Sequence, residues 1–359
     1  MPVKHVIIPV FVPHRGCPYS CIFCNQKKIS GQTDDITPED VPRIIETHLD
    51  TVRPGSFVEV AFYGGSFTAI GKDLQKSFLE KASPYRTAGR VSEIRLSTRP
   101  DSIDGEILDM LRQYGVKTIE LGVQSLNDEV LRASFRGHDA AAVYKAVSLI
   151  KEGGFRLGIQ TMTGLPSDNR EGCLDTARQV IAMSPQLVRI YPVLVIKGTG
   201  LEKMLLSGEY VPQSLDEAVE LCAELLELYE ARGINVIRIG LQATENIREG
   251  PGSEVAAGPV HPAFRQLVES KRMLRRIEAE IRRKGLAGAK SLTVTTGLSN
   301  VSNVIGQKRK NIKYLEKKYG ILSKKSKGLN RFAGKLSAID SSGGYWMLST
   351  GGMGGCFCI

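Results

Sequence analysis

Short apolar runs alternate with longer amphipathic segments through the first 240 residues, and this alternation constrains the fold more than any other feature. The expected strands are Val6–Val12, Val58–Phe62, Glu93–Ser97, Thr118–Val123, Arg156–Met162, Leu187–Val195 and Val236–Ile239. Helical periodicity lies between most of them, at Pro38–Leu49, Lys72–Ala82, Asp104–Tyr114, Ala140–Gly153, Glu171–Met183 and Leu215–Arg232. Repeated strand–helix units predict an α/β fold with a parallel sheet, here a partial (β/α)6 barrel of the TIM type. Functional side chains are then expected at the carboxyl ends of the strands.

The sequence after the last expected strand changes in composition. Residues 246–261 are rich in Gly and Pro, which indicates a loop or linker between a core over 1–245 and an extension over 246–320. The extension is predicted to be a small α+β unit, with helices at Pro262–Lys284 and Lys308–Tyr319 and strands at Ser291–Thr295 and Val301–Ile305. Residues 321–359 show no clear period, so we expect a poorly ordered tail. Helix ends that need a left-handed residue are expected at Gly115, Gly153 and Gly233.

The net charge of +10 is concentrated near the C-terminus. Residues 261–359 contain 20 Lys or Arg and 5 Asp or Glu, whereas the first 260 residues contain 28 and 33. Two expected helices carry most of these cations, namely Lys271, Arg272, Arg275, Arg276, Arg282, Arg283 and Lys284 on one and Lys308, Arg309, Lys310, Lys313, Lys317 and Lys318 on the other. Such clusters are typical of polyanion-binding proteins and are consistent with a nucleic-acid partner, the alternative being a solvated basic surface.

The cysteines and the apolar runs together indicate a cellular compartment. No apolar run reaches the roughly 18 residues of a membrane span, and Pro9 and Pro13 interrupt the apolar stretch near the start. We therefore expect a cytoplasmic protein with no membrane partner. Seven cysteines, an odd number in a long chain, favour metal or redox chemistry over a disulfide framework.

Three cysteines lie together in the segment Cys17-Pro-Tyr-Ser-Cys21-Ile-Phe-Cys24, directly after the first expected strand. This spacing lets three thiolates converge on one metal centre, whereas closed zinc sites and fully protein-bound cubane clusters normally take four protein ligands. The next cysteine is Cys173, so one position of such a centre stays open. The alternative is a Cys₃His zinc site completed by His14, in a non-catalytic nucleic-acid-binding protein.

The triplet after the first strand of a βα repeat resembles the cluster motif of the radical S-adenosylmethionine (SAM) superfamily. The resemblance implies that Cys17, Cys21 and Cys24 bind a [4Fe–4S] cluster, whose open iron is chelated by S-adenosylmethionine. In such enzymes the reduced cluster cleaves the sulfonium to methionine and a 5′-deoxyadenosyl radical. The resemblance also implies a reductant such as flavodoxin or ferredoxin.

Other segments at expected strand ends resemble the cosubstrate-binding elements of this superfamily. The Gly-Gly of Phe62–Phe67 resembles the element that receives the methionine amino group, because glycine lets a ligand approach the backbone. Gln124 and Arg136 resemble the pair that contacts the ribose and the methionine carboxylate, for which a planar guanidinium is suited. Ser97 stands where Elongator-like sequences have glutamate. The residues that the resemblance places at the cosubstrate are Phe23, Gly64, Gly65, Ser66, Ser97, Gln124, Arg136 and Gln160.

Residues 5–245 are most similar to the radical subunit of Elongator and to oxygen-independent coproporphyrinogen oxidases. With the basic extension, this resemblance predicts an enzyme of tRNA modification, in which Tyr191 and Lys197 are candidates to face the substrate. Tetrapyrrole oxidation is the alternative, although those enzymes have a further cysteine where this chain has Asn25 and Gln26. No acyl-CoA motif follows the expected barrel, so we expect no acetyltransferase module.

Overall fold

The structure is a computed structural model in which two compact units are described. The described residues are 4–12, 17, 19–25, 28–29, 36–242, 244–287, 289, 291–292, 294, 296 and 300–320, with three two-residue strands beyond them. The first unit comprises Met1–Ala218 and Leu228–Pro262, and the second comprises Val219–Glu227 and Ala263–Ile359.

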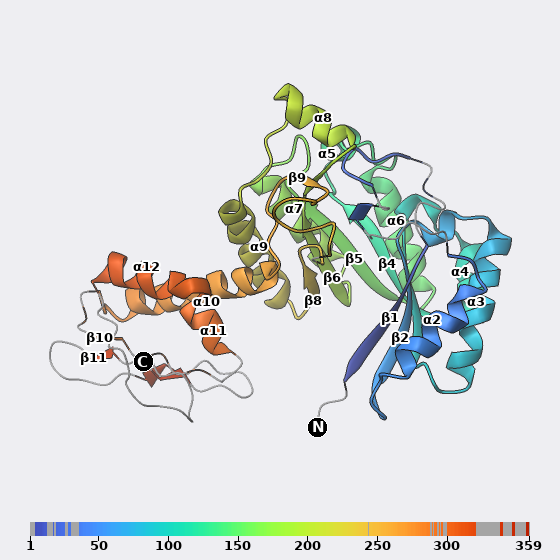
Figure 1. Cartoon of the computed structure of the whole chain (residues 1–359), viewed down its shortest axis with the longest axis horizontal. Helices are drawn as coiled ribbons and strands as arrows, with labels where there is room; N and C mark the ends of the chain where they lie inside the picture. Colours follow the sequence, from blue (N-terminus) through green and yellow to red (C-terminus); the bar gives the residue numbers. More distant parts are fainter. Residues whose placement is uncertain are drawn as a thin grey trace. The chain divides into compact units, whose positions relative to one another are not determined.

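The first unit is built on one curled sheet of seven parallel strands, in the order β1-β2-β3-β4-β5-β6-β8 (Figure 1). The strands are β1 His5–Phe11, β2 Phe57–Tyr63, β3 Glu93–Thr98, β4 Val116–Gln124, β5 Arg156–Thr163, β6 Leu187–Pro192 and β8 Asn235–Ile239. The helices between them are α2 Asp40–Leu49, α3 Lys72–Thr87, α4 Gly105–Gln113, α5 Asp128–Ala133, α6 Ala140–Glu152, α7 Arg170–Ala182, α8 Gly200–Ser207 and α9 Leu215–Glu230, with 3-10 turns η1 Phe67–Ala69 and η2 Pro100–Ser102. The expected α/β partial barrel is therefore confirmed, with six βα units followed by a seventh strand.

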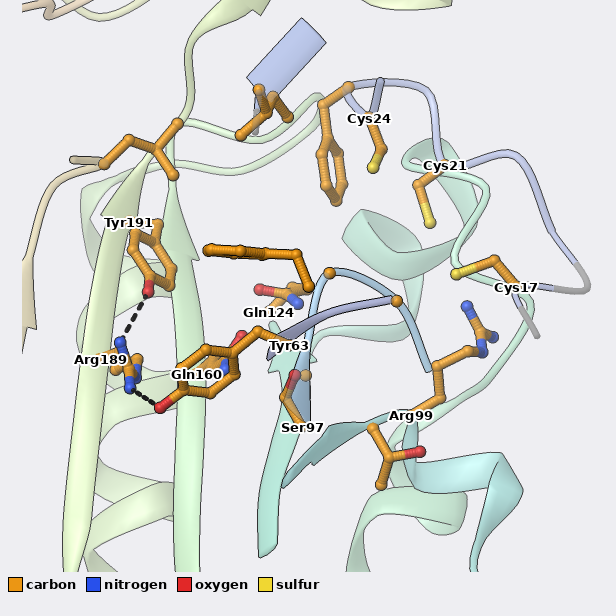
Figure 2. Close-up of a pocket in the computed structure, with 18 of the residues that line it drawn as sticks. Cys17, Cys21, Cys24, Tyr63, Ser97, Arg99, Gln124, Gln160, Arg189 and Tyr191 are labelled. Atoms are coloured by element: carbon orange, nitrogen blue, oxygen red, sulfur yellow. Dashed lines mark hydrogen bonds between the residues drawn. The ribbon is translucent and has the colours of Figure 1, made fainter. Parts of the chain in front are cut away.

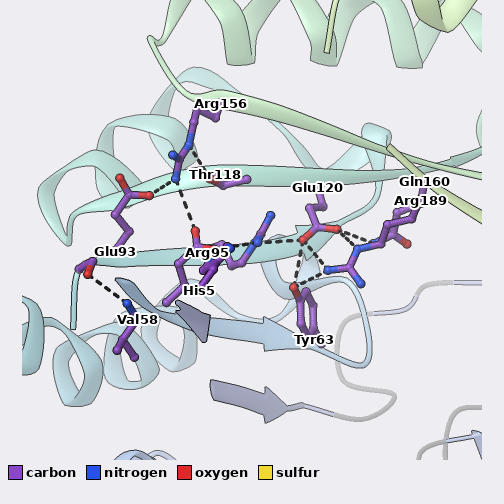
Figure 3. Close-up of polar contacts among 12 residues, drawn as sticks. His5, Val58, Tyr63, Glu93, Arg95, Thr118, Glu120, Arg156, Gln160 and Arg189 are labelled. Carbon is purple, nitrogen blue, oxygen red and sulfur yellow. Dashed lines mark hydrogen bonds and ion pairs between the residues drawn. The ribbon is translucent and has the colours of Figure 1, made fainter. Parts of the chain in front are cut away.

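Alternate residues of each strand serve the two faces of the sheet. On β2, Phe62 is fully buried and packs against Phe78 of α3, with ring centroids 6.0 Å apart. Its neighbours Glu59 and Tyr63 belong to the polar set that fills the barrel interior (Figure 3). The helices cover the outer face with apolar stripes, as Val41 and Ile45 of α2 do. The outer face of the sheet is thus packed with apolar side chains, whereas its inner face carries polar side chains.

Two parts of the first unit differ from the prediction. The expected strand at Leu187–Val195 ends at Pro192, and β7 Val195–Ile196 pairs antiparallel with β9 Val255–Ala257. Part of the segment expected as a linker therefore packs on the first unit. The left-handed residue after α6 is Gly154, with φ +75°, because Gly153 stays right-handed at φ −68°.

The described part of the second unit is mainly helical. Besides Val219–Glu227 of α9, its helices are α10 Phe264–Arg283, α11 Val301–Ile305 and α12 Lys310–Tyr319, the last preceded by the 3-10 turn η4 Gln307–Arg309. The prediction of a strand at Val301–Ile305 is wrong, because this segment is the helix α11. Its apolar residues are spaced as on a helix face, and Val304 packs with Leu274 and Leu315. The other expected strand is reduced to β10 Ser291–Leu292, which pairs with β11 Ala338–Ile339.

The tail expected to be poorly ordered lies outside the described residues, except for three short strands. These are β11, β12 Met347–Leu348 and β13 Phe357–Cys358. No helix among the described residues is long and apolar enough to cross a membrane.

Candidate active site

A cavity of about 630 Å³ opens at the carboxyl ends of the parallel strands. Ten of the eleven expected site residues line it, namely Cys17, Cys21, Phe23, Cys24, Gly64, Gly65, Ser97, Gln124, Arg136 and Gln160 (Figure 2). They come from the three strands β3, β4 and β5 and from the segments that follow β1, β2 and β4. Motifs that are far apart in the sequence therefore meet in one place, as the barrel geometry requires.

Ser66 is the expected site residue that does not line the cavity. Its side chain is fully buried, with Ser66 Oγ 2.9 Å from Thr98 Oγ1, and it accepts a hydrogen bond from the Arg99 N–H. Its own backbone N–H donates to the Cys17 thiol, which lowers the pKa of that thiol against larger opposing effects. Ser66 therefore acts on the cysteine loop from behind the cavity wall.

The three cysteines of the triplet lie close enough to influence one another electrostatically. In Figure 2 their sulfur atoms point toward the same space from one loop. Burial, and then the nearby Cys21, raise the pKa of Cys17 above its ordinary value. Burial, followed by Cys21 and Cys17, raises the pKa of Cys24 to about 12. Thiols in such a place become thiolates when a cationic centre binds them, which is the chemistry of an iron–sulfur cluster.

A cluster and a single metal ion require different spacings of the three thiols. No group of three His, Cys, Asp or Glu side chains in the described ranges converges tightly enough to hold one metal ion. A zinc ion would hold each thiolate at about 2.3 Å. A cubane presents a different iron to each cysteine, so its sulfur ligands stay further apart. His14, the fourth ligand of the zinc alternative, lies outside the described residues, as does Gln26.

Arg136 connects the cysteine loop to the end of β4. Arg136 Nη1 lies 3.1 Å from Cys21 Sγ, and Nη2 donates to the Gly122 carbonyl at 2.6 Å. Arg136 Nε and Gln124 Oε1 are buried and have no hydrogen-bond partner among the described residues. Gln124 is also held at φ +69°, a strained value for a residue with a side chain. Orphaned polar atoms and backbone strain in one wall of a cavity point to a ligand.

Arg99 is a second guanidinium beside the cysteines, and no role was predicted for it. It is almost fully buried, and both Nε and Nη2 donate to the Asp101 carboxylate at 2.9 Å. Nη2 also donates to the Arg136 carbonyl, and the Tyr19 ring covers the guanidinium with its centroid 4.9 Å from Cζ. Arg99 Nη1 has no partner in the described part of the chain, and the charge of Arg99 lowers the pKa of Cys17.

Below the cavity, buried ion pairs fill the barrel interior (Figure 3). Glu120 is fully buried, and its carboxylate oxygens lie 2.5 Å from Arg189 Nε and 3.1 Å from Arg95 Nε. The Arg95 contact is a Coulomb attraction alone, because the Nε–H does not point at the carboxylate. Burial by itself raises the pKa of Glu120, but Arg189 and Arg95 outweigh it and hold that pKa below its ordinary value. Tyr63 donates to the same carboxylate at 3.1 Å.

The cavity contains polar residues that sequence reasoning missed, chiefly Tyr63, Arg189 and Arg238. Their only signal in the sequence is a polar residue at an inward position of an otherwise apolar strand. Tyr191, a candidate to face the substrate, lines the cavity. Lys197, the other candidate, is not on its wall and donates to the Ser253 carbonyl at 2.6 Å.

Two protein-family models match the chain. Residues 11–180 match the model of the Radical SAM superfamily, and residues 185–276 match the Radical_SAM C-terminal domain. The chain therefore belongs to the radical SAM superfamily, and it is an enzyme of that class.

Curated relatives match the chain over part of their length. An uncharacterised protein of Methanocaldococcus jannaschii is 27% identical over 224 residues, which cover 61% of this chain and 65% of that protein. The tRNA uridine(34) acetyltransferase of the same organism is 29% identical over 189 residues, covering 47% of this chain and 35% of the enzyme. Human Elongator complex protein 3 is 31% identical over 191 residues, covering 48% of this chain and 35% of that protein. The chain thus spans about a third of the length of the last two.

A solved structure shares the fold. The archaeal Methanocaldococcus infernus Elp3 with an N-terminal deletion superposes with a TM-score of 0.58 at 22% sequence identity. The match covers 80% of this chain and 64% of that one.

Proposed function

We propose that this chain binds a [4Fe–4S] cluster through Cys17, Cys21 and Cys24, binds S-adenosylmethionine in the adjoining cavity, and modifies RNA. The observation that carries the proposal is the 3.1 Å contact of Arg136 with Cys21, which joins the thiol loop to the orphaned polar atoms of β4. When bound, the cluster supplies the electron that cleaves the sulfonium and generates a 5′-deoxyadenosyl radical.

The residues around the thiols suit the parts of the cosubstrate. Arg136 offers a planar guanidinium for the methionine carboxylate, and Gln124 offers an amide for ribose hydroxyls. Gly64 has φ +98°, and a Cβ there would lie 3.3 Å from the Val12 nitrogen, so a side chain is excluded where the methionine amino group is expected. In this arrangement the chain's own groups orient the sulfonium before it is cleaved.

RNA is the proposed substrate class because of the relatives and of the basic second unit. The name of one relative describes an enzyme that acts on tRNA uridine. Part of the basic surface is internally neutralised, since Lys271 and Arg275 pair with Glu220 and Lys318 pairs with Glu278. In the described part of the second unit, the exposed cations without a hydrogen bond or ion pair are Arg282, Lys308, Lys313 and Lys317. These four are the proposed phosphate contacts.

Anaerobic reconstitution tests the cluster and the cosubstrate. The wild-type chain should take up iron and sulfide, turn brown, and release 5′-deoxyadenosine when given S-adenosylmethionine and dithionite. Cys21→Ala should lose both properties, whereas the control Cys222→Ala, which changes a cysteine away from the cavity, should keep them. Undiminished release from Cys21→Ala would disprove the assignment of the triplet.

A nucleoside comparison tests the substrate. Mass spectrometry of tRNA nucleosides from a deletion strain should show one modified nucleoside missing, and re-expression of the wild-type chain should restore it while Cys21→Ala should not. An unchanged nucleoside profile would reject RNA and leave the radical chemistry standing.

A further inference from the structure

A row of polar side chains crosses the sheet on the far side of the cavity from the thiols. In the strand register Gln160 of β5 pairs with Arg189 of β6, and Arg189 pairs with Arg238 of β8. Paired residues of neighbouring strands project from the same face of a sheet. All three line the cavity, so two arginines stand side by side at its wall.

Arg189 is already neutralised on one edge. Its Nε and Nη2 contact the Glu120 carboxylate, and Nη2 also donates to the Tyr63 hydroxyl at 2.7 Å. Its Nη1 has only a long contact of 3.5 Å with the Tyr191 hydroxyl (Figure 2). The edge of Arg189 that carries Nη1 is thus available for a further acceptor.

Arg238 has no counter-charge. Its side chain is half-buried, and no carboxylate or carbonyl among the described residues pairs with it. The lining residues of the cavity include four arginines and no carboxylate. Arg99 has Asp101, Arg189 has Glu120, and Arg136 contacts Cys21 and the Gly122 carbonyl, so Arg238 is the lining arginine with neither a counter-charge nor a hydrogen bond among the described residues. Like charges at paired positions destabilise a sheet unless another group compensates them.

We propose that Arg238, together with the Nη1 edge of Arg189, binds the phosphate of a nucleotide in the substrate. A guanidinium matches phosphate oxygens in a two-pronged geometry, so the charge of Arg238 balances the single negative charge of an RNA phosphodiester and Arg189 Nη1 adds a hydrogen bond. This inference rests on the proposed action on RNA and adds where the substrate is anchored. The phosphate would lie across the cavity from the cysteines, which leaves the space between them for the reacting nucleoside and the cosubstrate.

The test is binding by the purified full-length chain, measured by calorimetry and independent of the cluster. Each of the four nucleoside 5′-monophosphates is compared with its nucleoside, and S-adenosylhomocysteine is added as competitor. At least one nucleotide should bind about tenfold or more tightly than its nucleoside. Arg238→Gln should remove this preference, and S-adenosylhomocysteine should not displace the nucleotide. The control Arg232→Gln makes the same charge change at an exposed position and should bind like the wild type.

Several results would overturn the inference. They are equal affinity for nucleotide and nucleoside, unchanged binding by Arg238→Gln, or displacement by S-adenosylhomocysteine, which would assign the arginines to the cosubstrate. Binding of succinate but not of inorganic phosphate through Arg238 would replace the nucleotide by a carboxylate substrate. Arg238→Gln removes a like-charge contact, so its melting temperature should equal or exceed that of the wild type, and lost binding is then not misfolding.

The outcome is separable from that of the cluster experiment. If Arg238 binds nucleotides but no 5′-deoxyadenosine is released, the proposed function fails and the anion site stands. If release is normal and Arg238→Gln binds nucleotides as the wild type does, the anion site alone fails.

Discussion

Replacement of the buried Glu120 by Gln is expected to destabilise the barrel by about 3 kcal/mol at neutral pH, because Arg189 then lacks its counter-charge and Arg95 keeps only Glu59. The Glu120 side chain is fully buried, and both Arg189 and Arg95 lie within 3.1 Å of its oxygens. Removing one partner of a buried ion pair costs about 3–5 kcal/mol. Gln keeps the volume and one acceptor oxygen, so the lower figure applies, and about 3 kcal/mol lowers the folded-to-unfolded ratio roughly a hundredfold.

Urea unfolding followed by circular dichroism measures this loss, and hydrogen exchange localises it to β4 and β6. The control is Glu106→Gln, because Glu106 forms an exposed pair with Lys72 that contributes less than about 1 kcal/mol. The folded pKa of Glu120 lies below the ordinary 4.5, so its stabilisation is present above that pH and is lost as the pH falls through the folded value. The gap between wild type and Glu120→Gln should therefore shrink in acid. Equal stability of the two variants at pH 7, or a gap that widens in acid, would refute the reasoning.

Three further predictions concern other parts of the molecule. The double variant Lys313→Ala and Lys317→Ala should flatten the slope of log tRNA affinity against log salt by about 1.5, since each phosphate contact adds about 0.7–0.9; an unchanged slope would exclude α12 from the interface. Gly137→Ala should lower the melting temperature more than Gly154→Ala, because both have φ near +75° but only at Gly137 would the Cβ meet an aromatic ring at 2.4 Å. Burial, and then a nearby guanidinium, lower the pKa of His138 to about 4, so stability should fall by roughly 3 kcal/mol from pH 7 to pH 4 through this group. The fall should be smaller in His138→Gln, as urea midpoints at the two pH values will show.

The strand–helix alternation was sufficient to predict the sheet, because each strand carries its own apolar run and each helix its own stripe. The five-residue run at Val301–Ile305 was not assignable in this way, since a short apolar segment fits a strand and a buried helix turn equally well. Its partner surface on α10 decides the outcome, with Val304 packed against Leu274. Tertiary contacts of this kind cannot be read from local periodicity.

The residues of the candidate site also include some that the sequence could predict and some that it could not. Cys17, Gly64 and Gln124 were predictable because they end or follow strands within recognisable motifs, and parallel strands bring their carboxyl ends together. Arg189 and Arg238 belong to no motif, and only the register of β6 against β8 makes them neighbours. Arg99 was visible in the sequence, but its stacking on Tyr19 depends on the path of the cysteine loop.

The order of the strands has a mechanical consequence. The sheet begins with β1 and ends with β8, and these two are not hydrogen-bonded to each other. A closed barrel can widen only by breaking a ladder of hydrogen bonds, whereas here the loops after the two margins are joined by side-chain contacts, Asn246 to the Lys28 carbonyl and Lys28 to Glu254. The gap between β1 and β8 is therefore bridged by loops and not by the sheet, so the width of the cavity on this side depends on a few side-chain contacts.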